Sequence, residues 1–227
     1  MAFTSTLLAA LWLQVSLSAG IALTPPERWR RDLSTPLRIM PLGDSITRGS
    51  LSTNLNGYRG YLQTKLDGAP FDFIGTLADG SMTDRSHEGH SGKVLNDIQT
   101  PDRLETLVGR LFEHCPDSTV LVAQIIGAND TELQGSIDAY NSEVAARIGS
   151  RTTSGEHVAL VDMSRILDLA TDFADTKHPN DLVYAKMAAA WYEGIQQADL
   201  KGWIRDPVEP EVACGVGLND SDCAEDS

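Results

Sequence analysis

The sequence predicts an α/β fold, a three-layer α/β/α sandwich around a short parallel sheet. Four short, continuously apolar runs have the composition of strands that are covered on both faces, at residues 37 to 42, 71 to 75, 120 to 126 and 157 to 161. Helical periodicity lies between and after them, at residues 58 to 66, 101 to 113, 137 to 148 and 182 to 196. Because strands that alternate with helices require parallel crossovers, we expect helices on both faces of the sheet.

Each element has a local sequence signal. The strand runs read, in chain order, LRIMPL, FDFIG, VLVAQII and HVALV. The helix over 101 to 113 opens with Pro101 directly after Thr100, a position where the missing N–H of proline leaves no hydrogen bond unmade. The sequence contains no internal repeat and no linker, so residues 23 to 205 are predicted to form one domain.

The composition is that of a soluble, acidic globular domain. The 227 residues include 32 Asp or Glu and 18 Lys or Arg, which gives a formal net charge of −14, and 41% of them are hydrophobic. A surface this negative repels phosphate backbones and anionic lipid headgroups, and the sequence has no cluster of Lys and Arg to oppose this repulsion. Nucleic-acid binding is therefore excluded, and no membrane association is expected after removal of a leader.

The two ends of the chain differ from its centre. Residues 1 to 22 carry no charged side chain and are too short and too polar to span a membrane comfortably, so they are predicted to be a secretory signal that is cleaved before Leu23. The first residues lack the usual Lys or Arg, which leaves a buried N-terminal helix as the alternative. Residues 206 to 227 contain seven acids and no Lys or Arg, and they are predicted to be largely disordered.

Secretion into the extracellular space would place the three cysteines in an oxidising compartment. Cys214 and Cys223 are close enough in sequence to close a small loop, which leaves Cys115 over. Cys115 follows a helical pattern and precedes Pro116, and it is predicted to be a partly buried free thiol rather than a nucleophile. The cysteine spacing does not fit a zinc site, so no metal ion is expected.

Polar residues follow the predicted strands, where a parallel α/β sheet forms its reactive crevice. GDS at 43 to 45 follows the first strand, HEGHSG at 87 to 92 the second, GAND at 127 to 130 the third, and DTKHP at 175 to 179 comes after the fourth. Gly-Asp-Ser and His-Pro are each common loop sequences. Their joint occurrence at successive strand ends favours a reactive site.

Ser45, Asp175 and His178 are the predicted catalytic residues. A serine hydroxyl is a weak nucleophile until a base takes its proton, and a third group must hold that base in one tautomer. Asp175 and His178 are three residues apart in a turn that ends in proline. The carboxylate is therefore expected to reach Nδ1 of the imidazole while Nε2 faces Ser45.

Attack on an acyl carbon creates an oxyanion, which needs hydrogen-bond donors held in advance. The candidate donors are the backbone N–H of Ser45, the backbone N–H of Gly89 and the side-chain amide of Asn129. Glycine suits the second position because it lets backbone and substrate approach closely. His87 and His90 flank Gly89, and either could touch the substrate, although a structural role is more common for such residues.

Several separated segments resemble the GDSL-type or SGNH hydrolases, specifically the secreted carbohydrate-esterase branch that is similar to acetyl xylan esterases. These segments are RIMPLGDSITRG, NGYRGYL, FDFIGTL, GSMTDRSHEGHSG and HPNDLVYAKMAAAWY, and the resemblance runs from about residue 37 to residue 196. It implies a flavodoxin-like sandwich, Ser45 as nucleophile, Gly89 as an oxyanion donor, and Asp175 with His178 as the base pair. It also implies an acetylated polysaccharide as substrate and no metal or organic cofactor.

One departure from the family pattern affects the centre of the sheet. After the HEGHSG segment, family members carry a strand that ends in Gly-x-Asn-Asp, whose Asn completes the oxyanion hole; here residues 96 to 99 run straight into Thr100, and this third strand is missing. The GAND motif follows the strand that aligns with the family's fourth. If residues 120 to 126 move into the vacated place, Asn129 recovers the donor role; if they keep their own place, the sheet has a gap.

Such a gap is expected to close during folding. Each buried ladder group left unpaired costs about 1 to 3 kcal/mol, against a total stability of roughly 5 to 15 kcal/mol. Asn129 also begins an Asn-Asp-Thr glycosylation sequon, as Asn219 begins Asn-Asp-Ser. A glycan on Asn129 would bar that residue from catalysis.

These observations predict a secreted, monomeric serine esterase that removes acetyl or other short acyl groups from a polysaccharide, or from a small ester, through an acyl-enzyme. The missing strand motivates an alternative, a catalytically impaired or non-catalytic relative that binds carbohydrate or is an incomplete gene product. Phosphoester hydrolysis has little support, because the sequence has no P-loop, metal-ligand cluster or basic anion clamp.

Overall fold

The computed structural model describes residues 33, 35 to 92, 101 to 128, 130 to 163, 166, 172 to 175 and 177 to 207. They belong to a unit that spans Asp32–Ser227, and a separate unit, Met1–Arg31, lies outside the described residues. The predicted signal at 1 to 22 and residues 208 to 227 of the predicted acidic tail also lie outside them. Among the helices that are described, none combines the length and the apolar character that crossing a bilayer requires.

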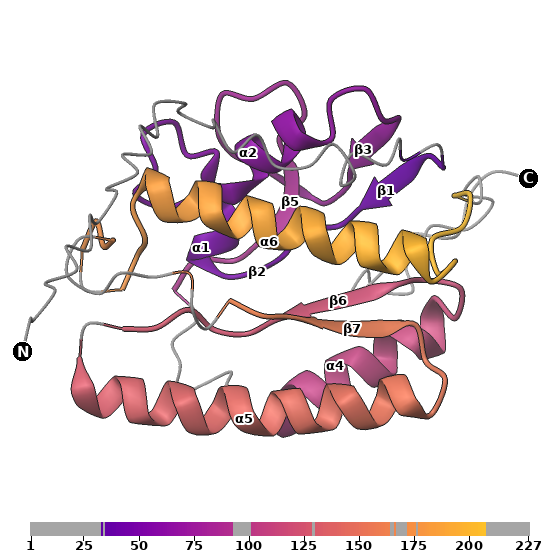
Figure 1. The fold of residues 1–227 in the computed structure, drawn as a ribbon. Helices are drawn as coiled ribbons and strands as arrows, with labels where there is room; N and C mark the ends of the chain where they lie inside the picture. Colours follow the sequence, from indigo (N-terminus) through magenta and orange to yellow (C-terminus); the bar gives the residue numbers. More distant parts are fainter. Residues whose placement is uncertain are drawn as a thin grey trace, which may run out of the picture. The chain divides into compact units, whose positions relative to one another are not determined.

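Short strands alternate with helices along the chain (Figure 1). The elements are β1 Leu37–Ile39, β2 Leu42–Gly43, α1 Ser45–Arg48, α2 Gly57–Lys65, β3 Phe71–Phe73, β4 Leu77–Ala78, β5 Ser86–Gly89, α4 Pro101–His114, β6 Val120–Ala123, α5 Thr131–Thr153, β7 Val158–Val161 and α6 Asp181–Leu200. All four predicted strand runs and all four predicted helices are present, and the α/β fold class is confirmed. The short α1 and the antiparallel β4–β5 pair have no counterpart in the prediction.

Parallel pairing joins strands that lie far apart in sequence. β1 pairs with β3, β2 with β5, and β6 with β7, all in parallel, whereas β4 and β5 are antiparallel. In the β2–β5 pair Gly43 lies opposite Gly89. This register brings the chain just before Ser45 beside the end of β5.

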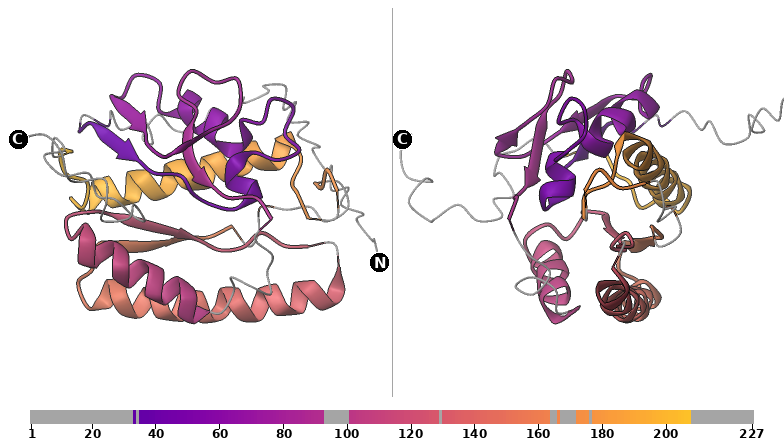
Figure 2. Two further views of the ribbon diagram at one scale, coloured as in Figure 1. Left: turned by 180° about the vertical axis from the view of Figure 1, so that it is seen from behind. Right: turned by 90° about the vertical axis from the view of Figure 1, so that its left-hand side faces the viewer.

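The parallel strands do not form one continuous sheet. In the part of the chain that the structure describes, no ladder joins β1 or β2 to β6, and Figure 2 shows β6 and β7 grouped with α4 and α5. Residues 120 to 126 thus keep their place beside β7, the second of the two alternatives that the sequence left open. The sheet therefore has a gap between β1 and β6, at the place where the resemblance puts the missing third strand. We expected this gap to close during folding, and among the described residues that expectation is wrong.

Contacts with the helices explain why β6 stays beside β7. Val122 belongs to a buried apolar cluster whose other members are Val108, Val144, Ile148 and Val158. Just beyond β6, the backbone N–H and C=O of Ile125 both bond to the side-chain amide of the buried Asn141 on α5, each at 2.8 Å. The Asn141 amide satisfies backbone groups that would otherwise need a strand partner.

α6 links the two groups of strands. Its buried side chains pack against α2 and against β7, and the larger apolar cluster of the domain combines side chains of α2, α6, β1 and β3 with Val161 of β7. The β6–β7 pair has α6 on one face and α4 with α5 on the other (Figure 1). This half of the domain has the helix–sheet–helix layering that the alternating pattern predicts.

Cys115, which follows α4, is disulfide-bonded, so the prediction of a free thiol is wrong. Its partner lies outside the described residues, as do Cys214 and Cys223. Sequence spacing favoured the close pair because a short loop closes easily. Spacing does not determine which cysteines the fold brings together.

Candidate active site

Ser45 is the first residue of α1, and Asp44 alone separates it from the end of β2. Asp44 caps this helix, because its Oδ1 accepts a hydrogen bond from the N–H of Ile46 at 2.8 Å. A Cβ at Gly43 would lie 2.3 Å from Oγ1 and 3.1 Å from Cβ of Thr47, so glycine there leaves room for the Thr47 side chain where α1 approaches β2. The Ser45 hydroxyl is therefore held at a sharp turn from strand to helix.

Ser45, His178 and Asp175 lie in a row. Oγ of Ser45 is 2.9 Å from Nε2 of His178, and Nδ1 of His178 is 2.9 Å from Oδ2 of Asp175. In such a row the imidazole can accept the hydroxyl proton, while the carboxylate fixes the tautomer and orientation of the ring. The arrangement has the geometry of an activated serine nucleophile.

The turn that carries Asp175 also keeps it ionised. Its Oδ1 accepts hydrogen bonds from the N–H of Lys177 at 2.7 Å and from the N–H of His178 at 2.6 Å. Partial burial raises the pKa of Asp175, but these backbone hydrogen bonds and the contact with the His178 ring outweigh burial and lower the pKa to about 2. The carboxylate therefore orients the imidazole without competing for its proton near neutral pH.

The segment around His178 is closed by local contacts. Phe173 and Pro179 form an antiparallel bridge across the turn. Asn180 then caps α6, since its Oδ1 accepts from the N–H of Val183 at 3.1 Å. His178 is thus fixed relative to the start of α6.

Two further contacts hold the loop after Ser45 against α6. The backbone N–H of Thr53 donates to Oδ1 of Asp181 at 3.1 Å, and its hydroxyl donates to Oδ2 of the same carboxylate. The hydroxyl of Tyr184, whose side chain is buried, donates to the C=O of Ser50 at 2.7 Å. Neither contact has a local sequence signal, and neither was predicted.

A buried cation braces the chain beneath this loop. Arg59, on α2, is fully buried and donates hydrogen bonds of 2.9 to 3.2 Å to the backbone carbonyls of Thr47, Arg48, Leu55, Asp79 and Arg85. Burial lowers the pKa of the Arg59 guanidinium, although nearby acidic groups oppose this effect. Arg59 thereby joins the residues just after Ser45 to the segment that leads into β5. An arginine inside an apolar helix pattern is the one signal in the sequence that could have indicated this role.

The backbone N–H of Gly89 is already engaged. It donates to Nδ1 of His87 at 2.9 Å, which conflicts with its predicted role as an oxyanion donor. A Cβ at Gly89 would lie 2.5 Å from the backbone nitrogen of Arg48 and 3.0 Å from the oxygen of Asp44. Glycine is required here because α1 packs closely on β5.

The remaining predicted site residues differ in accessibility. His87 is fully buried, which agrees with the structural role that the sequence favoured over contact with a substrate. Burial lowers the pKa of His87, which agrees with a neutral ring whose Nδ1 accepts from Gly89. Half of the His90 side chain is exposed, and its Nε2 lies 2.9 Å from Oε2 of Glu88. Asn129 lies outside the described residues, so its role stays a prediction.

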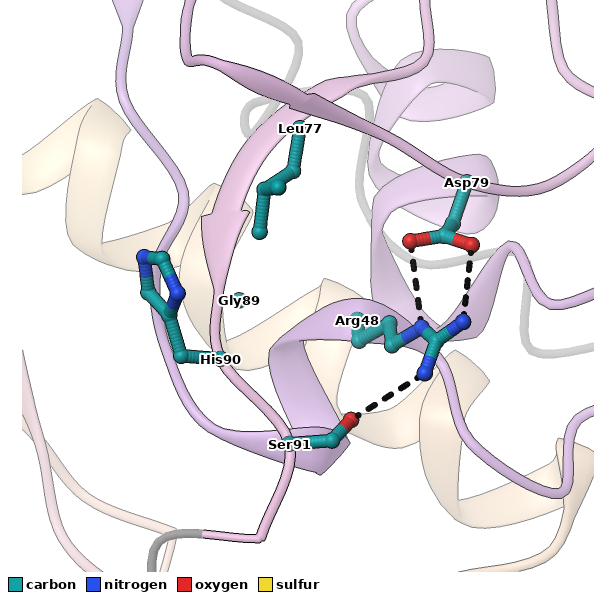
Figure 3. A pocket seen from close by; sticks show the side chains of 6 residues that line it. All are labelled: Arg48, Leu77, Asp79, Gly89, His90 and Ser91. Atoms are coloured by element: carbon teal, nitrogen blue, oxygen red, sulfur yellow. Dashed lines mark hydrogen bonds and ion pairs between the residues drawn. The ribbon is translucent and has the colours of Figure 1, made fainter.

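A surface pocket of about 330 Å³ adjoins α1. Its lining, drawn in Figure 3, consists of Arg48, Leu77, Asp79, Gly89, His90 and Ser91. The described ranges hold no group of three His, Cys, Asp or Glu side chains that could bind a metal ion.

No family model matches the chain. A search of curated proteins finds a multidomain esterase of Ruminococcus flavefaciens, 25% identical over 225 residues. The match covers 70% of this chain and 28% of that protein. The chain thus spans less than a third of the length of this relative.

Solved structures provide further matches. A family 3 carbohydrate esterase of Clostridium thermocellum superposes with a TM-score of 0.63 and 25% identity, covering 74% of this chain and 99% of that chain. A family 3 carbohydrate esterase of Talaromyces cellulolyticus gives a TM-score of 0.58 and 20% identity, covering 74% and 100%. A protein of Bacteroides ovatus described as a GDSL-like lipase gives a TM-score of 0.53 and 14% identity, covering 74% and 54%. The last two likenesses concern the fold alone.

Proposed function

We propose that this chain, a member of the GDSL/SGNH hydrolases with the fold of the carbohydrate esterases, is a serine esterase that removes acetyl or other short acyl groups from a polysaccharide. The observation that supports this function best is the row formed by Ser45, His178 and Asp175, with 2.9 Å at each link. An activated serine needs these three groups in this order.

The reaction would proceed in two acyl-transfer steps. Ser45 Oγ attacks the ester carbonyl carbon while His178 Nε2 takes its proton, and the same proton then passes to the departing sugar oxygen. The acyl-enzyme is hydrolysed by a water molecule that gives one proton to His178. That proton passes to Ser45 Oγ as the acyl–oxygen bond breaks, and the product leaves as a carboxylic acid that releases its own proton to the solvent. No metal or organic cofactor is needed in this sequence of steps.

We assign one donor of the oxyanion hole and name a candidate for the second. The backbone N–H of Ser45, at the N-terminus of α1, is the first, because no acceptor for it is found within the described residues. We do not assign Gly89 as the second donor, since its N–H binds His87. The Asn129 amide is retained as the candidate.

We extend this proposal to an acetylated polysaccharide as the substrate and to secretion of the chain. The match with a family 3 carbohydrate esterase supports a carbohydrate ester as substrate, and the match with a multidomain esterase supports ester hydrolysis. Residues 1 to 22, which carry no charge and contain an apolar run, support export. If the chain is exported and processed before Leu23, N-terminal sequencing of the protein from culture medium will begin at that residue.

Hydrolysis of 4-nitrophenyl acetate and labelling by a fluorophosphonate test the esterase function. We expect the wild-type chain to react at Ser45 stoichiometrically, and Ser45→Ala to lose the label and at least about 10⁴-fold in kcat/KM. Ser154→Ala, which changes an exposed serine at the end of α5, should behave as wild type. Equal hydrolysis by the wild type and Ser45→Ala would reject the proposal.

The gap between β1 and β6 favours a second candidate, a relative that binds carbohydrate without cleaving it. In such a protein Ser45, His178 and Asp175 would be in place, but the oxyanion hole would lack one of its donors. A folded chain, shown by cooperative thermal unfolding, that takes up no fluorophosphonate would select this second function.

A further inference from the structure

The pocket beside α1 is built from charged and hydroxyl groups. In Figure 3, Arg48, Asp79 and Ser91 lie on one side of Gly89, His90 lies on the other, and Leu77 lies above it. Nε and Nη2 of Arg48 each donate to a different carboxylate oxygen of Asp79 at 3.1 Å. This bidentate contact fixes the plane of the guanidinium.

The pocket nevertheless keeps hydrogen-bonding capacity for a ligand. An arginine has five N–H donors, and the one contact of Nη1 in the pocket is with Oγ of Ser91 at 3.5 Å, which is too long for a strong bond. The Ser91 hydroxyl can donate as well as accept, and the His90 ring is half exposed. Leu77 adds an apolar surface to these polar groups.

The charges of the pocket compensate one another. The hydrogen bond from Arg48 is the main cause that lowers the pKa of Asp79, so the carboxylate is ionised and neutralises the guanidinium. Oε2 of Glu88 lies 2.9 Å from Nε2 of His90. An anionic ligand would have to displace Asp79 from Arg48, whereas an uncharged ligand with several hydroxyl groups would use the free donors as they stand.

The pocket also lies next to the proposed nucleophile. Ser45 and Arg48 are three residues apart in α1, so their side chains lie on the same side of the helix, with Cβ atoms about 5 to 6 Å apart. The volume of the pocket, about 330 Å³, lies at the lower end of the range found for ligand sites, about 300 to 1,000 Å³. This space suits a single sugar ring.

We propose that this pocket binds one uncharged sugar ring of the polysaccharide and so positions its ester group at Ser45. The inference rests on the proposed function for the ester. Binding of the sugar itself does not depend on catalysis, and the two can be tested apart.

The test measures binding in the Ser45→Ala chain by NMR titration and calorimetry with xylotetraose, cellotetraose and mannotetraose, and with tetragalacturonate as the anionic comparison. We expect at least one neutral oligosaccharide to bind and to shift the amide signals of Leu77, Gly89 and Ser91. Adding Arg48→Met should raise its Kd at least tenfold. Arg110→Met, at an exposed site on α4, should leave the Kd unchanged.

A second variant guards against misfolding, because Arg48 also contributes to the local structure. Ser91→Ala combined with His90→Ala removes two exposed side chains and should raise the Kd at least threefold with unchanged thermal unfolding. The inference is overturned if no neutral oligosaccharide binds, if the pocket variants bind as well as the Arg110→Met control, or if tetragalacturonate binds in preference. Fluorophosphonate labelling of the wild type without oligosaccharide binding would overturn this inference alone. Binding without labelling would overturn the esterase proposal alone.

Discussion

Oγ of Ser45 lies 2.9 Å from Nε2 of His178, although 133 residues separate the two positions in sequence. The turn that carries His178 lies just before α6, and Ser45 starts α1 just after β2. Their distance therefore depends on how the loop after α1 packs against α6. The contacts of Asp181 with Thr53 and of Tyr184 with Ser50 span this same boundary.

Asp181→Ala tests whether the contact between Thr53 and Asp181 holds Ser45 against His178. We expect kcat/KM for 4-nitrophenyl acetate to fall about tenfold, since displacements near 1 Å cost up to about 100-fold. Thr53→Val removes the hydroxyl contact but keeps the backbone N–H that donates to Asp181, so it should cause a smaller loss. The double variant should lose no more than Asp181→Ala, which removes both hydrogen bonds. Glu193→Ala, exposed on the same helix, is the matched control. Full activity of Asp181→Ala would show that the contact is dispensable.

Asp175→Asn separates orientation of the imidazole from the rest of the site. The amide cannot hold His178 in the tautomer that the carboxylate selects, so we expect kcat to fall by about 10²- to 10⁴-fold while fluorophosphonate labelling becomes slow. Steady-state kinetics of the two chains measure this loss. A variant with more than a tenth of the wild-type kcat would contradict the proposed role of Asp175.

The low pKa of Asp175 also predicts a pH dependence of stability. Its pKa is about 2 in the folded chain and near 3.9 in an unfolded one, so the folded state binds fewer protons between these values. The stabilisation is complete above pH 4 and is lost as the pH falls towards 2. Urea unfolding of the wild type and Asp175→Asn at pH 7, 4 and 3 should show the difference in free energy of unfolding shrinking as the pH falls. A constant difference would contradict the lowered pKa.

The sequence predicted those parts of the site whose cause is local. Asp175 and His178 share one turn, and Asp44 and Ser45 follow a recognisable strand, so their placement needed no knowledge of distant contacts. Gly89 was predicted to be an oxyanion donor that a substrate approaches closely. The close neighbour in the fold is α1, and the N–H of Gly89 donates to His87, neither of which the local sequence indicates. The place of β6 likewise depends on Asn141, a polar residue whose partner lies 16 residues away.

Arg59→Met should destabilise the domain strongly. It would remove the donor of five backbone carbonyls while leaving those groups buried, at about 1 to 3 kcal/mol for each one that water cannot reach. We expect the free energy of unfolding in urea to fall by at least about 3 kcal/mol. Lys65→Met, at an exposed position of the same helix, should change it by less than about 0.5 kcal/mol. Similar values for the two variants would show that water satisfies the carbonyls.

Gly89→Ala and Gly135→Ala should act in opposite directions. The added methyl group at position 89 would lie 2.5 Å from the backbone of Arg48 and push α1 away from β5, lowering both stability and kcat. At position 135, inside α5, nothing lies within 4 Å of the added group, and alanine should stabilise the helix by up to about 1 kcal/mol. Thermal unfolding and hydrolysis of 4-nitrophenyl acetate measure both effects. Full activity of Gly89→Ala would contradict the tight packing of α1.

The gap in the sheet predicts unequal amide exchange along β6. In a parallel strand, alternate residues direct their N–H groups to opposite edges. Val120 and Gln124 donate toward β7, to the oxygens of His157 and Val161, so Leu121 and Ala123 face the opposite edge, where no ladder is found among the described residues. We expect hydrogen exchange, followed by NMR, to be at least about 100-fold faster at Leu121 and Ala123 than at Val122. Equal protection would mean that another segment or a second molecule pairs with this edge, and that the gap is closed in solution.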